Sequence, residues 1–299
     1  MAQIKEERVR RHPPQPGGCG CPRNCMKHRI LAALAALWAT AACAAPLVIT
    51  GAPNGSWGAM SARYTPIAHY LSAALHRPVV FRSADDLVDF GQFIKHRRAA
   101  IIFGGPQILS WAEKRHGYVP VLAARGSFRF VLVARSQAVH SIRSLRDGQS
   151  ICGLPFPNLG TMVLFTHYTN PLLQPYIVLV PSPIAAVHGV SQGRCMAASV
   201  PINVLNRLNK TLKHPLHIVA HLGRFPNQGF AVSGQLAPVL RQQITEALMA
   251  GAHAGALQSL QAANGIVGWE PPGPTRYVGY GHLVSGVLGY TAFDRNKAP

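Results

Sequence analysis

Three segments of this 299-residue chain combine residues that could hold an anion. The segments are residues 54–64, 104–107 and 158–161. Each follows an apolar run and precedes residues whose apolar side chains recur at the spacing of a helix. A helix start presents unpaired N–H groups and about half a positive charge, so an oxyanion can bind there without a dedicated cation. The candidate ligand-binding residues are Ser56, Tyr64, Gly105, Pro106, Gln107, Asn158, Gly160 and Thr161. Each one alone could be an ordinary cap or turn residue, because caps favour the same residue types.

The charge balance agrees with an anionic ligand. The chain has 29 Lys and Arg against 10 Asp and Glu, a formal net charge of +19, and no acidic residue lies between Gly148 and Thr245. Cation sites normally use carboxylates, whereas anions are held by N–H groups, hydroxyls, Arg and Lys. A basic chain could also bind nucleic acid, but aromatic and basic residues are not interleaved, so we expect no nucleic-acid partner.

Catalytic signatures are missing from the sequence. It has no nucleophile elbow, no Walker loop and no zinc signature, so we expect a protein that is not an enzyme and that uses no cofactor. His217 and His221 are four residues apart, with His214 nearby, which would suit a metal only on a helix. The alternation after Pro215 predicts a strand, on which four residues span roughly 13 Å, so we predict structural histidines and no metal.

The amino-terminal region predicts export. Residues 26–29 are basic, residues 30–39 are apolar and residues 40–45 are small, a pattern typical of a secretory signal peptide over residues 26–44. We expect cleavage after Ala44 and a periplasmic protein, with lipidation of Cys43 as the alternative. Residues 1–25 precede a complete signal and are expected to be a non-native upstream extension, rather than a metal site at their cysteines. After cleavage Cys152 and Cys195 remain, either as a disulfide or as two buried thiols.

The rest of the chain alternates between strands and helices, which predicts parallel sheets covered by helices. Apolar runs at 47–50, 79–81 and 99–103 alternate with helical spacing, and a second series begins at the strand 150–153. We therefore predict two α/β lobes, each a mainly parallel sheet flanked by helices. Lobe one would comprise residues 46–134 and 223–290, and lobe two residues 135–222. The chain would cross twice, near 135 and near 223, and an amphipathic helix at 236–250 would pack on lobe one.

Several short motifs resemble the binding subunits of phosphate, phosphite and phosphonate ABC importers, in the order found in that family. They are residues 64–71 (YTPIAHYL), 101–106 (IIFGGP), 117–120 (GYVP) and 141–148 (SIRSLRDG). The resemblance implies a type 2 periplasmic-binding fold, a small oxyanion bound between the lobes, and delivery to an ABC permease by a monomer. The alternative is a ligand sensor for a membrane receptor or kinase, with a different small ligand.

The departures from that family concern ligand choice. Residues 98–99 (RA) and 193–195 (GRC) stand where the family commonly has an Asp, and residues 107–109 (QIL) replace its aromatic after the glycine-proline turn. Acidic residues in these proteins hold the ammonium group of an aminophosphonate. We therefore do not expect an aminoalkylphosphonate as the ligand.

Overall fold

A computed structural model describes residues 45–145, 148–287 and 289–290. The expected upstream extension, the signal peptide and Cys43 lie outside the described residues, as do Arg146 and Asp147 of the 141–148 motif. None of the helices in the described part combines the length and apolar character needed to cross a membrane.

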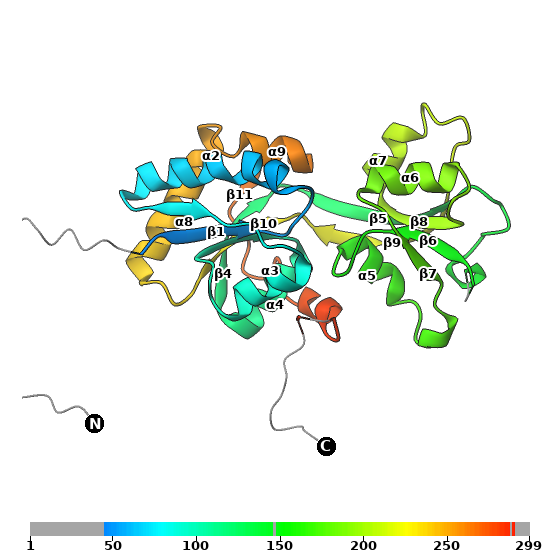
Figure 1. The fold of residues 1–299 in the computed structure, drawn as a ribbon, viewed down its shortest axis with the longest axis horizontal. Helices are drawn as coiled ribbons and strands as arrows, with labels where there is room; N and C mark the ends of the chain where they lie inside the picture. Colours follow the sequence, from blue (N-terminus) through cyan, green and yellow to red (C-terminus); the bar gives the residue numbers. More distant parts are fainter. Residues whose placement is uncertain (1–44, 146–147, 288, 291–299) are drawn as a thin grey trace, which may run out of the picture. The chain divides into compact units, whose positions relative to one another are not determined.

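The first sheet has six strands in the order β11-β4-β10-β3-β1-β2. Figure 1 labels β1, β4, β10 and β11 of this sheet. Its strands are β1 (Leu47–Gly51), β2 (Val79–Phe81), β3 (Ile101–Gly104), β4 (Tyr118–Ala124), β10 (Gly229–Ser233) and β11 (Trp269–Glu270). The accompanying helices are α2 (Trp57–Leu75), α3 (Leu87–Lys95), α4 (Pro106–His116), α8 (Pro238–His253), α9 (Gln258–Asn264) and the short 3-10 helix η3 (Tyr280–Val284).

The second sheet has five strands in the order β7-β6-β8-β5-β9. Its strands are β5 (Ser127–Ala134), β6 (Ser150–Gly153), β7 (Tyr176–Leu179), β8 (Ala197–Pro201) and β9 (His217–Pro226). The accompanying helices are α5 (Leu159–Phe165), α6 (Pro183–Ser191), α7 (Ile202–Leu208) and the 3-10 turns η1 (Ile142–Ser144) and η2 (Pro171–Leu173). The prediction of two α/β sheets flanked by helices is confirmed.

Each sheet is mixed rather than mainly parallel. Strands β2, β1 and β3 pair in parallel, as do β7, β6 and β8. Strand β10 pairs antiparallel with both β3 and β4, and β5 pairs antiparallel with both β8 and β9. Strand β4 leads directly into β5, and β9 leads directly into β10, so neither step contains the helical crossover that joins parallel neighbours.

The two crossings between the sheets lie at positions that differ from the predicted ones. Residues 127–134 form β5, which is bonded on both sides within the second sheet, although the sequence prediction placed them in lobe one. Strand β9 continues to Pro226 before β10 starts at Gly229. The chain therefore crosses at residues 125–126 and 227–228 instead of near 135 and 223. An apolar run such as β5 does not itself indicate which sheet it joins.

Alternating side chains divide each sheet into two packed faces. In β5, Val131 and Val133 belong to one core cluster, whereas Phe130 and Leu132 belong to another. On the first sheet, α2 and α8 pack together through a cluster that includes Ile67 and Leu248. The packing of the 236–250 helix on lobe one is thus as predicted.

The second sheet carries a disulfide between Cys152 of β6 and Cys195, which precedes β8. Their Cα atoms are 5.5 Å apart, and β6 and β8 are parallel neighbours. Gly189 of α6 makes room for this bond, because a Cβ atom there would lie 2.6 Å from the sulfur of Cys152. Of the two alternatives that the sequence leaves open, the structure has the disulfide.

Candidate ligand-binding site

The start of α4 follows the carboxyl end of β3 directly. Gly105 is the N-cap residue, with an extended backbone (φ −76°, ψ 168°), and Pro106 occupies the first turn. Proline suits this position because its fixed φ fits a helix and the missing N–H would be unpaired there. No side chain caps the helix at Gly105. Pro106 has no N–H, and the N–H of Ile108 donates to the carbonyl of Gly105 at 3.1 Å, so the N–H of Gln107 is the first-turn donor that no local cap uses.

The start of α5 is capped by its own residues. The Oδ1 atom of Asn158 accepts hydrogen bonds from the N–H groups of Gly160, at 3.0 Å, and Thr161, at 3.4 Å. The hydroxyl of Thr161 donates to the carbonyl of Leu154, at 2.8 Å. Gly160 lies against Phe130, where a Cβ atom would approach a ring carbon at 2.7 Å. These groups thus stabilise the loop before α5, and the hydrogen of Thr161 is already engaged.

The start of α2 is also capped. It lies before Tyr64, although the helical spacing of apolar residues in the sequence begins only at that residue. The helix begins at Trp57, and Oγ of Ser56 accepts from the N–H of Ala59 at 3.3 Å. Tyr64 is therefore two turns inside α2, where it is 3% exposed and stacks on Phe81 with ring centroids 5.0 Å apart. Burial raises the pKa of Tyr64, so its hydroxyl stays protonated.

The Tyr64 hydroxyl nonetheless lies at the carboxyl end of β1. A Cβ atom on Gly51, the last residue of that strand, would overlap with the hydroxyl oxygen. Only glycine fits at this point, because the tyrosine side chain already fills the volume. Tyr64 is thus a core residue whose polar end reaches a strand end.

One hydrogen bond joins two of the predicted segments. Nε2 of Gln107, in the first turn of α4, donates to the carbonyl of Pro157 at 2.9 Å, and this contact is buried. Pro157 directly precedes the N-cap Asn158 of α5. The structure therefore brings the α4 start and the loop before α5 together, whereas Ser56 caps α2 and Tyr64 lies in the core of the first sheet.

Two buried oxygen atoms near this contact have no hydrogen-bond partner among the described residues. They are Oε1 of Gln107 and Oγ of Ser199. A Cβ atom on Gly160 would lie 3.2 Å from Oγ of Ser199, so this hydroxyl lies beneath the start of α5. Ser199 was not among the predicted residues, because a serine inside an apolar strand carries no motif.

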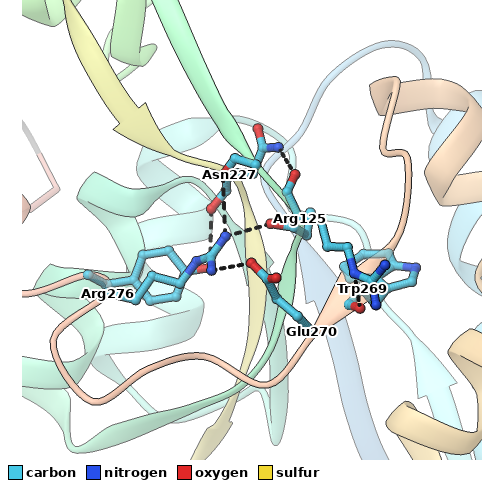
Figure 2. Close-up of polar contacts among 8 residues, drawn as sticks. Arg125, Asn227, Trp269, Glu270 and Arg276 are labelled. Carbon is cyan, nitrogen blue, oxygen red and sulfur yellow. Dashed lines mark hydrogen bonds and ion pairs between the residues drawn. The ribbon is translucent and has the colours of Figure 1, made fainter.

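The first crossing is held by a guanidinium from the carboxyl-terminal segment, as Figure 2 shows. Arg276 pairs with Glu270 of β11, and its Nη2 donates to the carbonyls of Ala124, at 2.7 Å, and Gly126, at 3.3 Å. The side chain of Arg276 is 17% exposed and that of Glu270 35%. One arginine thus holds the backbone on both sides of residue 125.

The second crossing is tied to the first by Asn227 (Figure 2). Its side chain donates to the carbonyl of Arg125, and the hydroxyl of Tyr277 donates to the carbonyl of Asn227 at 3.1 Å. The Nε atom of Arg125 donates to the carbonyl of Trp269 at 3.0 Å. We call Arg125, Asn227, Glu270, Arg276 and Tyr277 the hinge cluster. No motif identified it, because its members are far apart in the sequence.

An open pocket of about 400 Å³ lies beside the hinge cluster rather than over the helix starts. It is lined by Gly126, Ser127, Arg224, Phe225, Pro226, Glu270, Arg276 and Tyr280. At the helix starts, the two segments meet through the Gln107–Pro157 hydrogen bond and through Met162, which belongs to one core cluster with residues of α4.

The histidines considered as metal ligands lie as the sequence predicts. His217 and His221 lie on the strand β9, as predicted, and the ring of His217 contacts the carbonyl of Val139. Within the described ranges, no three His, Cys, Asp or Glu residues are grouped closely enough for a metal ion. Trp57 begins α2 and is 72% exposed.

Two α/β sheets joined by two crossing segments, with helix starts at the carboxyl ends of parallel strands, define a type 2 periplasmic-binding fold. The chain belongs to a specific family with that fold. The model of the ABC transporter phosphonate periplasmic substrate-binding proteins matches residues 49–277. The family that the sequence motifs suggested is thereby confirmed, and a periplasmic location follows from membership in it. No curated protein matches the chain.

Solved structures with the same fold include two proteins linked to phosphonate binding or transport. PhnD1 from Prochlorococcus marinus, in complex with methylphosphonate, is 10% identical with a TM-score of 0.63, over 80% of this chain and 96% of that one. A binding protein component of a phosphonate ABC transporter from Pseudomonas aeruginosa is 13% identical with a TM-score of 0.59, over 78% and 83%. XAC2383 from Xanthomonas citri, bound to ATP, is 16% identical with a TM-score of 0.67, over 82% and 99%.

Proposed function

We propose that this protein captures a small oxyanion of the phosphate, phosphite or phosphonate class between its two lobes and delivers it to an ABC permease. The observation that carries the proposal is the start of α4, which follows β3, has no side-chain cap and meets the second lobe through Gln107. Ligands of open α/β sheets bind at the carboxyl ends of the strands, where such helix starts provide N–H donors.

The proposed site consists of residues 105–107 from the first lobe and the loop 157–161 from the second. No acidic residue occurs in the second lobe from Gly148 onward, so the site there has no carboxylate to repel an anion. Asn158, Gly160 and Thr161 shape the loop that closes on the ligand. We assign Ser56 and Tyr64 supporting roles, at the cap of α2 and the end of β1.

The role of the hinge cluster is to let the lobes close over the ligand. Its side chains hold both crossings in one arrangement, while the described residues at the helix starts join the lobes through the Gln107–Pro157 hydrogen bond. Closure of two lobes around a bound ligand is the common motion of hinged binding proteins. We propose no catalytic step and no cofactor.

Thermal unfolding of the mature chain tests this function. A ligand that binds only the folded state stabilises it by about 2.7 kcal/mol at a hundredfold excess over Kd. We expect phosphate, phosphite or methylphosphonate at millimolar concentration to raise the melting temperature, while chloride at the same ionic strength does not. If none of these oxyanions shifts the transition, the oxyanion proposal is wrong. A shift with an organic ligand only would favour the sensor alternative.

A further inference from the structure

The carboxamide of Gln107 has a definite orientation. Its side chain is 5% exposed, and Nε2 donates to the carbonyl of Pro157 at 2.9 Å. A carbonyl oxygen can only accept, so the amide nitrogen must face Pro157 and Oε1 must point elsewhere. The second lobe thus sets the direction of the one acceptor that this side chain offers.

That acceptor lies at the uncapped start of α4. Oε1 of Gln107 is buried without a partner among the described residues, and a Cβ atom on the N-cap Gly105 would lie 2.6 Å from it. Helix α4 has eleven residues, and Gly105 supplies no side-chain cap. A buried acceptor without a donor is costly, so its presence beside the uncapped N–H of Gln107 calls for a ligand that provides the missing hydrogen.

We propose that Gln107 makes the site selective for an oxyanion that carries a hydroxyl hydrogen, such as a singly protonated phosphonate or hydrogen phosphate. This inference rests on the proposed function. An unprotonated oxygen of the ligand accepts from the N–H of Gln107 at the α4 start, and its P–OH group donates to Oε1 of Gln107. Sulfate and sulfonates have no such hydrogen at neutral pH, so one of their oxygens would face Oε1 with no bond.

The neutral amide suits this role better than a carboxylate would. An amide oxygen accepts a hydrogen bond without placing a second negative charge beside the anion, so the helix start keeps its full attraction. The absence of a Cβ atom at Gly105 provides the space in which the carboxamide lies. Selection then comes from one unpaired acceptor, the type of group that discriminates strongly against a ligand lacking its partner.

Calorimetry with matched anions tests the proposal. Methylphosphonate at pH 6 carries one hydrogen and one negative charge, and methanesulfonate has the same shape and charge without the hydrogen. We expect the mature chain to bind methylphosphonate at least about tenfold more tightly, a difference of roughly 1.4 kcal/mol. In Gln107→Met, which keeps the length but removes the amide, the preference should fall to within about threefold. Gln192→Met, an exposed substitution after α6, serves as the control and should keep the wild-type preference.

A second variant separates loss of the acceptor from loss of structure. Gln107→Glu keeps an acceptor of similar shape, so it should weaken both anions yet retain the preference for methylphosphonate. Circular dichroism confirms folding of each variant. If oxyanions bind but the preference is the same in Gln107→Met as in the wild type, this inference is wrong and the proposed function stands. If neither anion, nor phosphate, binds to the wild type, both are wrong.

Discussion

The two lobes of this protein meet in two regions that are built differently. In the hinge cluster, the carbonyls of residues 124, 125 and 126 each accept from a side chain, and the arginine that holds two of them is itself paired with Glu270. At the helix starts, the described residues form one hydrogen bond between the lobes, from Gln107 to Pro157, together with the apolar packing of Met162 and of Leu283 in η3. The first region is held by several polar contacts and the second by few.

The difference identifies which contact can open. One intramolecular hydrogen bond contributes about 0.5–1.5 kcal/mol net. A conformation in which the helix-start contact is broken can therefore be populated at equilibrium. Hydrogen bonds to charged groups contribute about 1.5–3 kcal/mol each, so the hinge cluster is expected to persist. Movement of the lobes would then separate α4 from α5 while residues 125–126 and 227–228 act as the pivot.

Removing the disulfide has the largest expected effect, because the comparison assumes that the second lobe moves as a rigid body. Cys152 and Cys195 close a loop with a sequence separation of 43 residues, for which the chain-entropy estimate is about 4 kcal/mol. We expect the free energy of unfolding of the double variant Cys152→Ala, Cys195→Ala, measured by urea denaturation, to be lower by about that amount. If stability is unchanged, or if mass analysis finds free thiols in the oxidised wild-type protein, the second lobe cannot be assumed to be held rigid by this bond.

Breaking the hinge cluster comes next in magnitude. Arg276→Met keeps the aliphatic stem but leaves Glu270 and the carbonyls of Ala124 and Gly126 without their donor, which should cost about 2–3 kcal/mol. Hydrogen exchange should accelerate at the N–H groups of residues 124 and 125, which bond across this region.

The control for the hinge is Arg207→Met, an exposed arginine on α7. It should change neither stability nor exchange by more than a few tenths of a kcal/mol. If Arg276→Met is equally neutral, the two regions do not differ in strength, and the pivot must be assigned elsewhere.

Thr161→Val probes the weaker region. The substitution keeps the shape but leaves the carbonyl of Leu154 without its donor, so stability should fall by about 1 kcal/mol. Because the hydroxyl hydrogen is already engaged, we expect methylphosphonate affinity to change by less than about threefold. A loss of tenfold or more in calorimetry would mean that the hydroxyl turns from Leu154 to the ligand, and that the loop rearranges on binding.

The alternation of strands and helices allowed the fold to be predicted, but not the pairing of its strands. Apolar runs such as β6, at residues 150–153, are visible in the sequence. The position of β10 between β3 and β4 is not, since it depends on contacts between residues more than a hundred positions apart. The assignment of β5 to the wrong lobe has the same cause.

The candidate site was predictable where local chemistry determines it. Gly105, Pro106 and Asn158 do occupy helix starts, because caps and first-turn prolines are set by their neighbours in sequence. The engagement of Thr161 by Leu154 and the contact of Gln107 with Pro157 were not predictable, because both depend on the course of a loop. The burial of Tyr64 was also not predictable, because α2 begins seven residues before it and places it inside the helix.

The smallest expected effect is at the carboxyl end of α4. It tests whether low pH destabilises the helix that carries Gln107 without loosening the hinge cluster. His116, in the last turn of α4, packs edge-on against Trp111 with ring centroids 4.4 Å apart. Burial, together with the positive charges of Arg97, Lys95, Arg115 and His96, lowers the pKa of His116 from 6.5 to about 4. The unfolded chain therefore takes up a proton at this residue below about pH 6.5, whereas the folded chain does so only near pH 4.

Proton uptake by the unfolded state means that stability should fall as the pH drops from about 6.5 to about 4. The fall will be modest, because His116 is only about half buried and solvent screens its charge. His116→Gln should remove this part of the acid dependence in urea unfolding at pH 7 and pH 5, whereas His253→Gln, at the exposed end of α8, should leave it in place. Hydrogen exchange at residues 124 and 125 should not respond to this pH change. If it does, the two regions are coupled, and acid loosens the hinge as well as α4.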